Sequence, residues 1–464
     1  MARPLAIAIL AAGKGTRLKS ARAKVLHEIG GKALLRHVID AAAQVVAAED
    51  IFVIVGHQAD AVEAAMRDTG VHFVLQAEQR GTGHAAQVLR DAWLTQGAAY
   101  DELLVLSGDV PLLTAETIRT LKNFHESQHA AMTILTAIPP DPTGYGRVIR
   151  AHEGLPDVSA IVEQKALTPE QMRAPEINSG IYCFQTAPLF AHLDELKTNN
   201  AHAEFYLTDM AALLVAAGER VVATPAPRAD QVLGANTIAE MMQLDATLRS
   251  DKARELMAAG VTIFAPETCV IDAAVTVGPD TVLEPNVQLR GNTKVGARCR
   301  IRSFSVLEDC ELGDDILIRN SCVLTGATIE RGAQIGPFAH LRPGTRIGEG
   351  AHIGNFVETK QATLHAGVKA GHLSYLGDAE IGAGTNVGAG TITCNYDGET
   401  KHRTKVGENV FIGSDSALVA PVTIGDGAYV AAGSIVTRDV PAKALAIGRA
   451  RQVTKENWVK GKKK

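Results

Sequence analysis

The sequence predicts an α/β domain with a largely parallel sheet, followed by a parallel β-solenoid built from six-residue repeats. The first observation is that short aliphatic runs at residues 5–10, 51–55, 71–75 and 103–106 alternate with helical stretches, as in βα units. The second is that the hydrophobic period changes to six after Gly260. Neither a helix nor an alternating strand explains this period, whereas a solenoid that takes one hexapeptide on each face does.

Aliphatic residues mark the repeat in three registers, and glycine follows many of them, as tight corners require. The series are Val277, Leu283, Leu289, Val295, Ile301 and Leu307; Leu317, Val323, Ile329, Ile335, Leu341, Ile347 and Ile353; and Val406, Ile412, Leu418, Ile424, Val430 and Val436. The segment 394–405 (CNYDGETKHRTK) breaks the register, so we expect it to project as a loop. Loops that stand out from a rigid scaffold frequently carry function.

These changes of pattern divide the chain of 464 residues into four parts. We expect the α/β domain at residues 1–235, a connector helix at 236–260, the solenoid at 261–449 and a C-terminal tail at 450–464, whose basic end at 460–464 we expect to be solvated. In the connector, Asn236 can cap a helix over residues 237–259, and Gly260 supplies its stop.

The charge balance and the cysteines exclude some classes of protein. The 46 basic and 51 acidic residues give a formal net charge of −5, which argues against a protein that grips nucleic acid or an anionic membrane. No apolar run approaches the roughly 18 to 20 residues that span a bilayer, and the apolar start lacks a convincing processing site. The six cysteines form no CxxC pair, so we expect a reduced, cytoplasmic protein with buried thiols.

A glycine-rich loop follows the first predicted strand, in the segment 10–18 (LAAGKGTRL). Backbone N–H groups in such a loop approach phosphate oxygens closely, while Arg17 and Lys24 offer the positive charge that a triphosphate and its leaving group require. The loop is not a Walker A motif, and it lacks the third glycine of the dinucleotide fingerprint. Taken alone, it is explained equally well by a plain tight turn.

Further polar motifs follow in the α/β region. They are Gln76 with the turn 81–84 (GTGH), 107–111 (SGDVP), 143–147 (TGYGR), 161–165 (IVEQK) and 177–180 (INSG). Asp109 follows a buried strand, at the end where parallel sheets bind ligands. Taken singly, Asp109 could instead be a helix cap, and the other motifs could be turns or solvated faces.

The solenoid carries polar residues that a scaffold does not need, in the segments 341–344 (LRPG), 355–360 (NFVETK) and 371–378 (GHLSYLGD). His372 can accept a proton near neutral pH, so it is a candidate general base for an amine that attacks a thioester. Most of the fifteen histidines are expected to be structural or solvated, but the motif around His372 favours a function.

These motifs resemble those of known families. Residues 13–17 (GKGTR) with Lys24 resemble the GxGTR(x)nPK signature of nucleotidyltransferases that make nucleoside-diphosphate sugars, with Ala23 in place of the usual proline. The ordered motifs over residues 5–460 resemble the bacterial family of bifunctional N-acetylglucosamine-1-phosphate uridylyltransferases/glucosamine-1-phosphate acetyltransferases. This resemblance implies a Rossmann-like nucleotidyltransferase domain with a mainly parallel sheet and a left-handed parallel β-helix of hexapeptide repeats.

For uridylyl transfer, the resemblance implies that Arg17 and Lys24 are catalytic and that Asp109 and Asn236 hold Mg²⁺, which prefers such hard oxygen donors. The turn with Gln76 would recognise uracil, and the later motifs would contact the sugar. The implied substrate contacts are Leu10, Ala11, Ala12, Gly13, Lys24, Gln76, Gly81, Thr82, Ser107, Gly108, Asp109, Gly146, Glu163, Asn178 and Asn236.

For acetyl transfer, the resemblance implies that His372 is the base and that Glu358 orients or polarises it. The implied contacts to the sugar phosphate are Arg342, Lys360, Tyr375, Asn386, Asn395 and Tyr396. Those to acetyl-coenzyme A are Ala389, Asn395, Tyr396, Ser414, Ala432 and Arg449. The role of His340 stays open.

The resemblance also implies a cytoplasmic homotrimer with acetyltransferase sites shared between neighbouring solenoids. Acetyl-coenzyme A would acetylate glucosamine 1-phosphate, and UTP would convert the resulting N-acetylglucosamine 1-phosphate into UDP-N-acetylglucosamine for peptidoglycan and lipopolysaccharide synthesis. An alternative is a monofunctional pyrophosphorylase with a silent trimerisation solenoid, against which the residues around His372 argue. A purely structural β-helix protein does not explain the glycine-rich loop.

Overall fold

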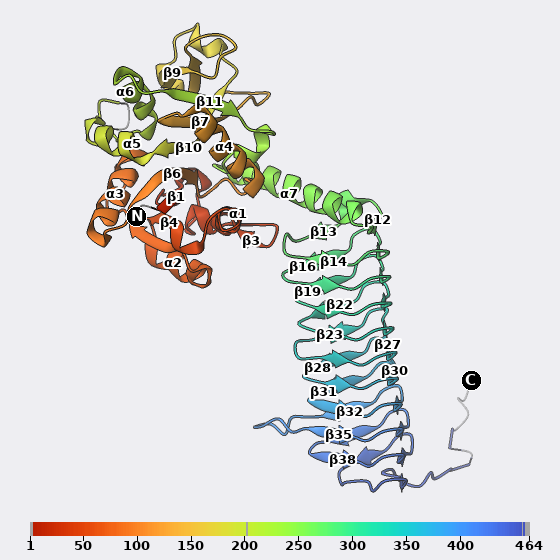
Figure 1. Cartoon of the computed structure of the whole chain (residues 1–464). Coiled ribbons are helices and arrows are strands. Elements are labelled where there is room, and N and C mark those ends of the chain that lie inside the picture. Colours follow the sequence, from red (N-terminus) through yellow and green to blue (C-terminus); the bar gives the residue numbers. More distant parts are fainter. Residues whose placement is uncertain (1–2, 201–202, 457, 460–464) are drawn as a thin grey trace. The chain divides into compact units, whose positions relative to one another are not determined.

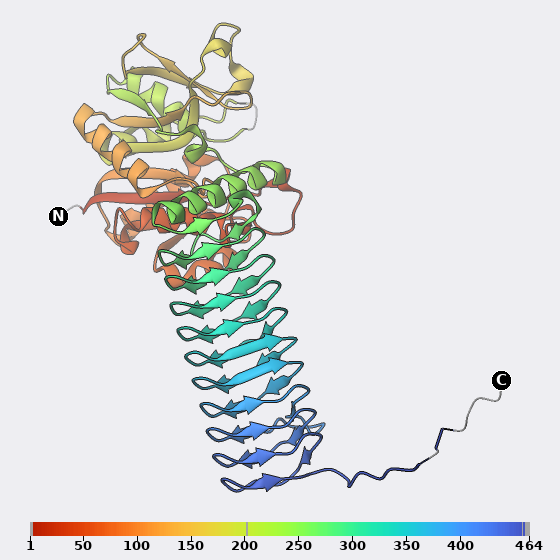
Figure 2. The ribbon, with the colours of Figure 1, turned by 90° about the vertical axis from the view of Figure 1, so that its right-hand side faces the viewer.

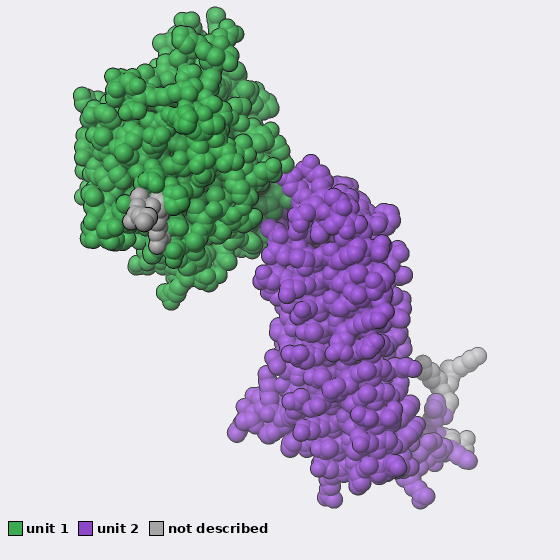
Figure 3. All heavy atoms as spheres, in the orientation of Figure 1, with its two compact units in different colours: residues 1–248 green, residues 249–464 purple. Residues whose placement is uncertain are grey.

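The computed structural model describes residues 3–200, 203–456 and 458–459, and the chain forms two compact units, Met1–Leu248 and Arg249–Lys464 (Figure 3). The division falls inside helix α7 (Ile238–Ala258), which is the expected connector (Figure 1). The basic end of the predicted tail, residues 460–464, lies outside the described residues. None of the described helices is both long and apolar enough to cross a membrane.

The first unit contains a mixed sheet in the order β11-β7-β10-β6-β1-β4-β5. Strand β10 runs antiparallel to β6 and β7, and the other neighbours along this order are parallel. The strands are β1 (Arg3–Leu10), β4 (Ile51–Val55), β5 (His72–Leu75), β6 (Tyr100–Ser107), β7 (Met132–Ala137), β10 (Ile177–Gln185) and β11 (Val221–Pro225), with the hairpins β8 (Arg147–Arg150) and β9 (Val158–Val162), and β2 (Glu28–Ile29) and β3 (Lys32–Ala33). The four predicted strands are confirmed, but β5, which we also expected to be buried, is buried only at Val74.

Helices cover both faces of this sheet, because alternate residues of each strand point to opposite sides. Ile7, Ile9 and Val53 pack with α1 (Leu34–Ala42), α2 (Ala59–Met66) and α4 (Ala115–Gln128). Ala6, Ala8 and Ile54 pack with α3 (Thr82–Gln96), α5 (Thr186–His192) and α6 (Met210–Ala216). The 3₁₀ helices are η1 (Thr16–Leu18), η2 (Lys24–Leu26), η3 (Ala48–Asp50), η4 (Arg67–Thr69), η5 (Gln164–Ala166), η6 (Gln171–Arg173), η7 (Leu193–Glu195), η8 (Leu207–Asp209), η9 (Ala229–Val232) and, in the second unit, η10 (Pro266–Thr268).

The second unit is a parallel β-helix with three sheets, one on each face (Figure 2). The first sheet contains β12 (Thr262–Ile263), β15 (Val282–Leu283), β18 (Arg300–Ile301), β21 (Leu317–Ile318), β24 (Gln334–Ile335), β27 (His352–Asn355), β30 (Lys369–His372), β33 (Asn386–Val387), β36 (Phe411–Ile412), β39 (Tyr429–Val430) and β41 (Leu445–Ala446). The second contains β13 (Val270–Ile271), β16 (Gln288–Arg290), β19 (Val306–Glu308), β22 (Val323–Thr325), β25 (His340–Leu341), β28 (Glu358–Lys360), β31 (Tyr375–Gly377), β34 (Ile392–Cys394), β37 (Ala417–Val419) and β40 (Ile435–Val436). The third contains β14 (Thr276–Val277), β17 (Lys294–Val295), β20 (Glu311–Leu312), β23 (Thr328–Ile329), β26 (Arg346–Ile347), β29 (Thr363–Leu364), β32 (Ala379–Ile381), β35 (Thr404–Val406) and β38 (Val422–Ile424).

The repeat residues fill the interior of the β-helix, with two exceptions. The first and third predicted series are buried throughout. In the second series Leu317 is only partly buried and Val323 is exposed, because Ile318 and Leu324 take the interior positions. The pairing of Ile301 with Ile318 shows that this coil is one residue shorter than the coil from Leu283 to Ile301. The regular spacing of six therefore fails where a corner loses a residue.

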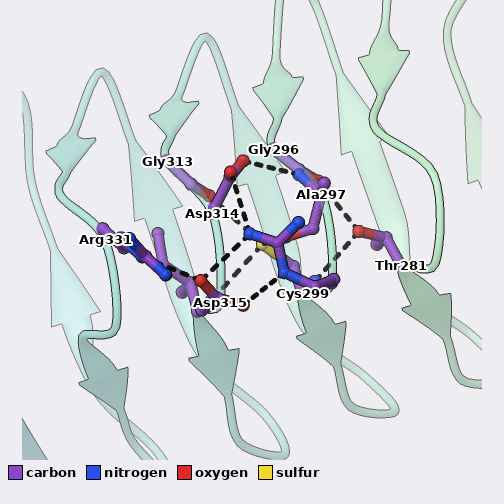
Figure 4. Close-up of polar contacts among 10 residues, drawn as sticks. Thr281, Gly296, Ala297, Cys299, Gly313, Asp314, Asp315 and Arg331 are labelled. Atoms are coloured by element: carbon purple, nitrogen blue, oxygen red, sulfur yellow. Dashed lines mark hydrogen bonds and ion pairs between the residues drawn. The ribbon is translucent and has the colours of Figure 1, made fainter.

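Polar contacts tie neighbouring coils together at one corner of the β-helix (Figure 4). Arg298 forms ion pairs with Asp314 and Asp315, and Arg331 reaches Asp315 from the next coil at 2.9 Å. The guanidinium of Arg298, and then that of Arg331, lower the pKa of Asp315 to about 2. Because these side chains are solvent-exposed, each ion pair contributes little stability.

The cysteines are free, and all but the partly buried Cys394 are buried, as expected. Burial raises the pKa of the Cys322 thiol to about 11, so this sulfur stays protonated at neutral pH. The thiols of the β-helix interior therefore behave as packing groups.

Helix α7 is capped by a residue other than the predicted one. The hydroxyl of Thr237 accepts a hydrogen bond from the Glu240 N–H at 3.2 Å, and the Glu240 carboxylate accepts one from the Asn236 N–H at 2.8 Å. This reciprocal pair resembles a capping box, and it leaves the side chain of Asn236 free of the helix end. In the second half of α7, Leu256 belongs to the β-helix core, and Arg249 forms an ion pair with buried Asp272 at 2.8 Å.

Candidate active sites

The first unit contains a cavity of about 840 Å³ near the carboxyl ends of β1 and β6. Its wall includes most of the residues that the sequence predicts for uridylyl transfer: Leu10, Ala11, Ala12, Gly13, Lys24, Gln76, Gly81, Thr82, Ser107, Asp109, Glu163 and Asn178. Gly108, Gly146 and Asn236 are not part of that wall but adjoin residues that are, and Arg17 reaches the wall only through Asn236. The fold thus gathers motifs separated by more than 150 positions.

The glycine-rich loop holds Lys24 at the edge of this cavity. Gly15 has a φ of 60°, and a Cβ atom there would lie 2.6 Å from the Cβ of Lys24. Glycine is therefore required both for the left-handed backbone and for the close approach of the lysine side chain. The loop and η2 together place the ammonium group of Lys24 at the end of β6.

Lys24, Asp109 and Asn236 converge on one point. The Lys24 ammonium forms an ion pair with the Asp109 carboxylate and donates to Oδ1 of Asn236 at 3.0 Å, and Arg17 donates to the same Oδ1 at 3.1 Å. Oxygen atoms from distant parts of the chain thus hold one cationic group between them. Carboxylate and amide oxygens are also ligands of Mg²⁺ in proteins, so Asp109 and Asn236 fit this ion.

The turn after Gln76 is packed against a segment that the sequence analysis missed. Buried Gln76 donates through Nε2 to the Gly81 carbonyl at 3.0 Å, and the Thr82 hydroxyl accepts from the Leu207 N–H at 3.0 Å. Gly81, at a φ of 103°, leaves no room for a Cβ beside the carbonyl of Phe205. This contact brings Glu204, Tyr206 and Thr208 into the cavity wall. No motif marks these residues, so only the fold reveals them.

Gly146, Glu163 and Asn178 lie together at another part of the cavity. The Asn178 N–H donates to the Gly146 carbonyl at 2.9 Å, and a Cβ on Gly146 would lie 3.6 Å from the Glu163 carboxylate. The Asn178 amide donates to the phenol of Tyr182 at 2.9 Å, and a register shift in β10 follows Asn178. Amide and carboxylate groups in this arrangement suit the hydroxyl and amide groups of a sugar.

In the β-helix, His372 ends strand β30 and is solvent-exposed. Its Nδ1 lies 2.6 Å from Oδ1 of Asn355, which occupies the paired position on the preceding coil. Because an amide oxygen only accepts, this contact favours the tautomer of the neutral imidazole in which Nδ1 carries the hydrogen and Nε2 has the lone pair. This is the tautomer that a general base needs.

Glu358 has a different partner from the one predicted. Its carboxylate accepts a hydrogen bond from Nη1 of Arg342 at 2.8 Å, whereas the partner that the structure gives to His372 is Asn355. The reason is register: Glu358 pairs with Tyr375 in the second sheet, while His372 ends a strand of the first. The expected orientation of His372 by Glu358 finds no support in these contacts.

Positive charge collects beside Glu358. The neighbouring Lys401 ammonium, and then the Arg342 guanidinium, lower the pKa of Lys360. Lys401 was not singled out from the sequence, although the interrupted repeat identified the loop that carries it. Three cationic side chains crowded together form a site suited to a phosphate group.

The interrupted repeat forms an ordered hairpin that stands out between β34 and β35 (Figure 1), as predicted. Asn395 anchors its base through a hydrogen bond from Nδ2 to the Asp378 carboxylate at 2.5 Å. Asp397 accepts from the Thr400 N–H and lies 2.6 Å from Nε2 of His402, and these contacts hold the pKa of its carboxyl well below the usual range. Tyr396 is therefore presented on a fixed, exposed turn.

The remaining predicted residues divide into two groups. Asn386 lies in β33, beside His372's strand, and Tyr375 lies in β31 beside Glu358. Ala389, Ser414, Ala432 and Arg449 follow one corner on successive coils: the Asp415 N–H donates to the Ala389 carbonyl and the Gly433 N–H to the Ser414 carbonyl, each at 2.7 Å. Their order along the β-helix axis gives an extended row rather than a compact pocket.

Comparisons with known proteins match both units of the chain. A MobA-like NTP transferase domain matches residues 7–168, a GMPPB C-terminal domain matches residues 265–335, and the bacterial transferase hexapeptide (six repeats) matches residues 326–361 and 403–438. Proteins called Bifunctional protein GlmU are similar over nearly their whole length. The one from Koribacter versatilis is 58% identical over 99% of this chain and 98% of its own length. The one from Solibacter usitatus is 50% identical over 100% and 98%, and the one from a serotype V strain of Streptococcus agalactiae is 43% identical over 98% and 97%.

The cavity with its glycine-rich loop, the β-helix with its cationic cluster and the full-length similarity lead to one family. The chain belongs to the bifunctional GlmU proteins, with a nucleotidyltransferase and an acetyltransferase activity that serve UDP-N-acetylglucosamine synthesis.

Proposed function

We propose that the cavity of the first unit is the uridylyltransferase site and that the residues around His372 belong to the acetyltransferase site. The observation that carries the first assignment is the convergence of Lys24, Asp109 and Asn236 beside the glycine-rich loop. The second rests on the tautomer of His372 and on the cationic cluster of Arg342 and Lys360. The two reactions then use separate groups of residues.

In acetyl transfer, the amine of glucosamine 1-phosphate attacks the thioester carbon of acetyl-coenzyme A. Nε2 of His372 takes the proton that the amine loses, and coenzyme A leaves as the thiolate. Asn355 holds the imidazole through Nδ1 and so keeps Nε2 available. Arg342, Lys360 and Lys401 receive the sugar phosphate, and Glu358 orients the fork of Arg342 rather than the imidazole of His372.

Tyr375 and Asn386 would contact the sugar, and the hairpin with Asn395 and Tyr396 would close over both substrates. The row of Ala389, Ser414, Ala432 and Arg449 would take the extended coenzyme. Its small side chains leave room along one corner, and Arg449 offers a charge for the phosphate groups.

In uridylyl transfer, a phosphate oxygen of N-acetylglucosamine 1-phosphate attacks the α-phosphorus of UTP, and pyrophosphate leaves. Lys24 and Arg17 stabilise the negative charge that develops on the leaving group. Asp109 and Asn236 would hold Mg²⁺, which neutralises phosphate charge when bound. The turn of Gln76, Gly81 and Thr82 would recognise uracil, and Gly146, Glu163 and Asn178 would fix the sugar.

The acetyltransferase assignment includes assembly into a homotrimer with sites shared between neighbouring β-helices. Within one chain, His372 lies on the first sheet whereas Lys360 and Tyr375 lie on the second. Phe338, Phe356 and Leu373 lie at one corner beside His372 and are exposed. A second copy of the chain would cover this apolar corner and complete the site. Because UTP and acetyl-coenzyme A are made there, the cytoplasm is the proposed location.

Product identification tests the proposal. The purified protein is incubated with glucosamine 1-phosphate, acetyl-coenzyme A, UTP and Mg²⁺, and the sugar products are followed over time. The proposal expects N-acetylglucosamine 1-phosphate first and UDP-N-acetylglucosamine next. Formation of the nucleotide sugar only when N-acetylglucosamine 1-phosphate is supplied would instead support a silent β-helix scaffold.

A further inference from the structure

Arg147, the last residue of the TGYGR motif, is buried among neutral oxygen acceptors. Its Nε donates to the Ala174 carbonyl at 3.0 Å, and its Nη1 donates to the Tyr145 carbonyl at 2.5 Å and to the Gln164 side-chain oxygen at 3.3 Å. Only 3% of the residue is exposed. Across the described part of the chain, no carboxylate lies within ion-pair distance of its guanidinium.

The three acceptors belong to the three segments that carry the sugar residues of the cavity. Tyr145 precedes Gly146, Gln164 follows Glu163, and Ala174 lies in the segment that leads into β10 and Asn178. The backbone of Arg147 also pairs with Val162 and with Ile177. Arg147 is thus bonded to the immediate neighbours of Gly146 and Glu163 and, through Ala174, to the segment that leads to Asn178.

A buried charge is costly unless its hydrogen bonds are satisfied, so the burial of the Arg147 guanidinium needs an explanation. The guanidinium is not part of the cavity wall. It does have the rigid fork of donors that can hold several acceptors in fixed relative positions. Displacements of about 1 Å in binding groups are enough to lower activity strongly.

We propose that Arg147 is a positioning residue of the uridylyltransferase site, which sets the affinity for N-acetylglucosamine 1-phosphate without touching it. It does so by fixing Gly146, Glu163 and Asn178 relative to one another. This inference rests on the proposed function of the cavity. The part of the cavity formed by the glycine-rich loop and Gln76 does not depend on Arg147.

Steady-state kinetics of Arg147→Met and Arg147→Lys in the full chain test the proposal. The expected result is a rise of about tenfold or more in KM for N-acetylglucosamine 1-phosphate, with KM for UTP within about twofold of the original. Lysine keeps the charge but not the fork, so Arg147→Lys is expected to resemble Arg147→Met. Acetyl transfer by the same preparations reports that the rest of the chain is folded.

Arg220, in the same unit, supplies the control. It forms an ion pair with Asp157 at 3.1 Å and donates to the Gln128 carbonyl at 2.7 Å, and neither residue lines the cavity or adjoins a residue that does. Arg220→Met should therefore leave the ratio of the two KM values unchanged. Should Arg147→Met not fold, Gln164→Met removes one of the three acceptors and is expected to raise the same KM by a smaller factor.

Two results would overturn the proposal. One is an unchanged KM for the sugar phosphate in folded Arg147 variants, or in Gln164→Met where the former do not fold. The other is an equal rise in both KM values, as a general loss of structure would cause. Absence of uridylyl transfer by the unaltered chain would be a different failure, because it contradicts the function of the cavity itself.

Discussion

At the scale of single residues, the environment of His372 decides its chemistry. Asn355 fixes Nδ1 as a donor, and the side chain is exposed at the end of β30, where a substrate can reach Nε2. The sequence motif identified the histidine, but it could not identify Asn355 as its partner. That partner is set by the register of two coils, which the motif does not encode.

Loss of this base should slow acetyl transfer selectively. His372→Ala is expected to reduce the rate by about 10²- to 10⁴-fold, the usual contribution of a positioned acid–base group. Uridylyl transfer should be unaffected. His352→Ala, which removes a histidine from the preceding strand of the same sheet, is the control and should acetylate at a near-normal rate. Near-normal acetylation by His372→Ala itself would mean that another group or water accepts the proton.

His125 gives the first unit a dependence of stability on pH. It is buried, its Nδ1 lies 2.7 Å from the Thr133 hydroxyl, its Nε2 has no partner among the described residues, and burial lowers its pKa to about 4. The unfolded chain therefore binds the proton more tightly than the folded one. The stability contributed by neutral His125 is fully present above pH of about 6.5 and is lost as the pH falls toward 4, by on the order of 3 kcal/mol.

Urea unfolding followed by the fluorescence of buried Trp93 measures this effect. His125→Asn keeps a group that can bond to Thr133 but cannot be protonated, so its stability should fall less steeply between pH 6.5 and 4 than that of the original chain. Equal slopes for the two proteins would show that His125 does not carry the acid sensitivity.

Secondary structure elements differ in how far the sequence could predict them. The period of six placed all but two of its predicted residues in the interior of the β-helix, because each face repeats the same packing. It misplaced Leu317 and Val323, since the loss of one residue at a corner leaves no mark in composition. The sequence also pointed to Asn236 as the cap of α7, whereas Thr237 caps it, and only the contacts of Lys24 show why Asn236 serves elsewhere.

The glycine-rich loop offers a test at the scale of an element. Ala23 stands where the nucleotidyltransferase signature has proline, and its φ of −53° lies within the range that a proline ring imposes. Ala23→Pro should therefore raise the free energy of unfolding by about 0.4–1 kcal/mol through the lower entropy of the unfolded chain. Uridylyl transfer should be retained. A loss of both stability and activity would mean that the loop needs a conformation that proline forbids.

At the scale of the whole molecule, one chain carries two sites that are built in different ways. The uridylyltransferase cavity depends on contacts between distant segments, so the sequence predicted most of its residues through motifs but missed the segment with Tyr206 and Thr208. The acetyltransferase residues lie on a repeating scaffold, where a position along the axis follows directly from the repeat. The sheet to which each of these residues belongs could not be predicted, because it depends on which corners of the β-helix are one residue short.

The central claim, two independent sites in one chain, is tested most directly by mixing two full-length variants. Asp109→Ala lacks a proposed Mg²⁺ ligand and should stop at N-acetylglucosamine 1-phosphate, whereas His372→Ala should consume that compound but not make it. Given glucosamine 1-phosphate, acetyl-coenzyme A, UTP and Mg²⁺, each variant alone should yield little UDP-N-acetylglucosamine, and the mixture should yield it readily. A mixture as inactive as its components, with both proteins folded, would contradict the assignment of the two reactions to separate sites.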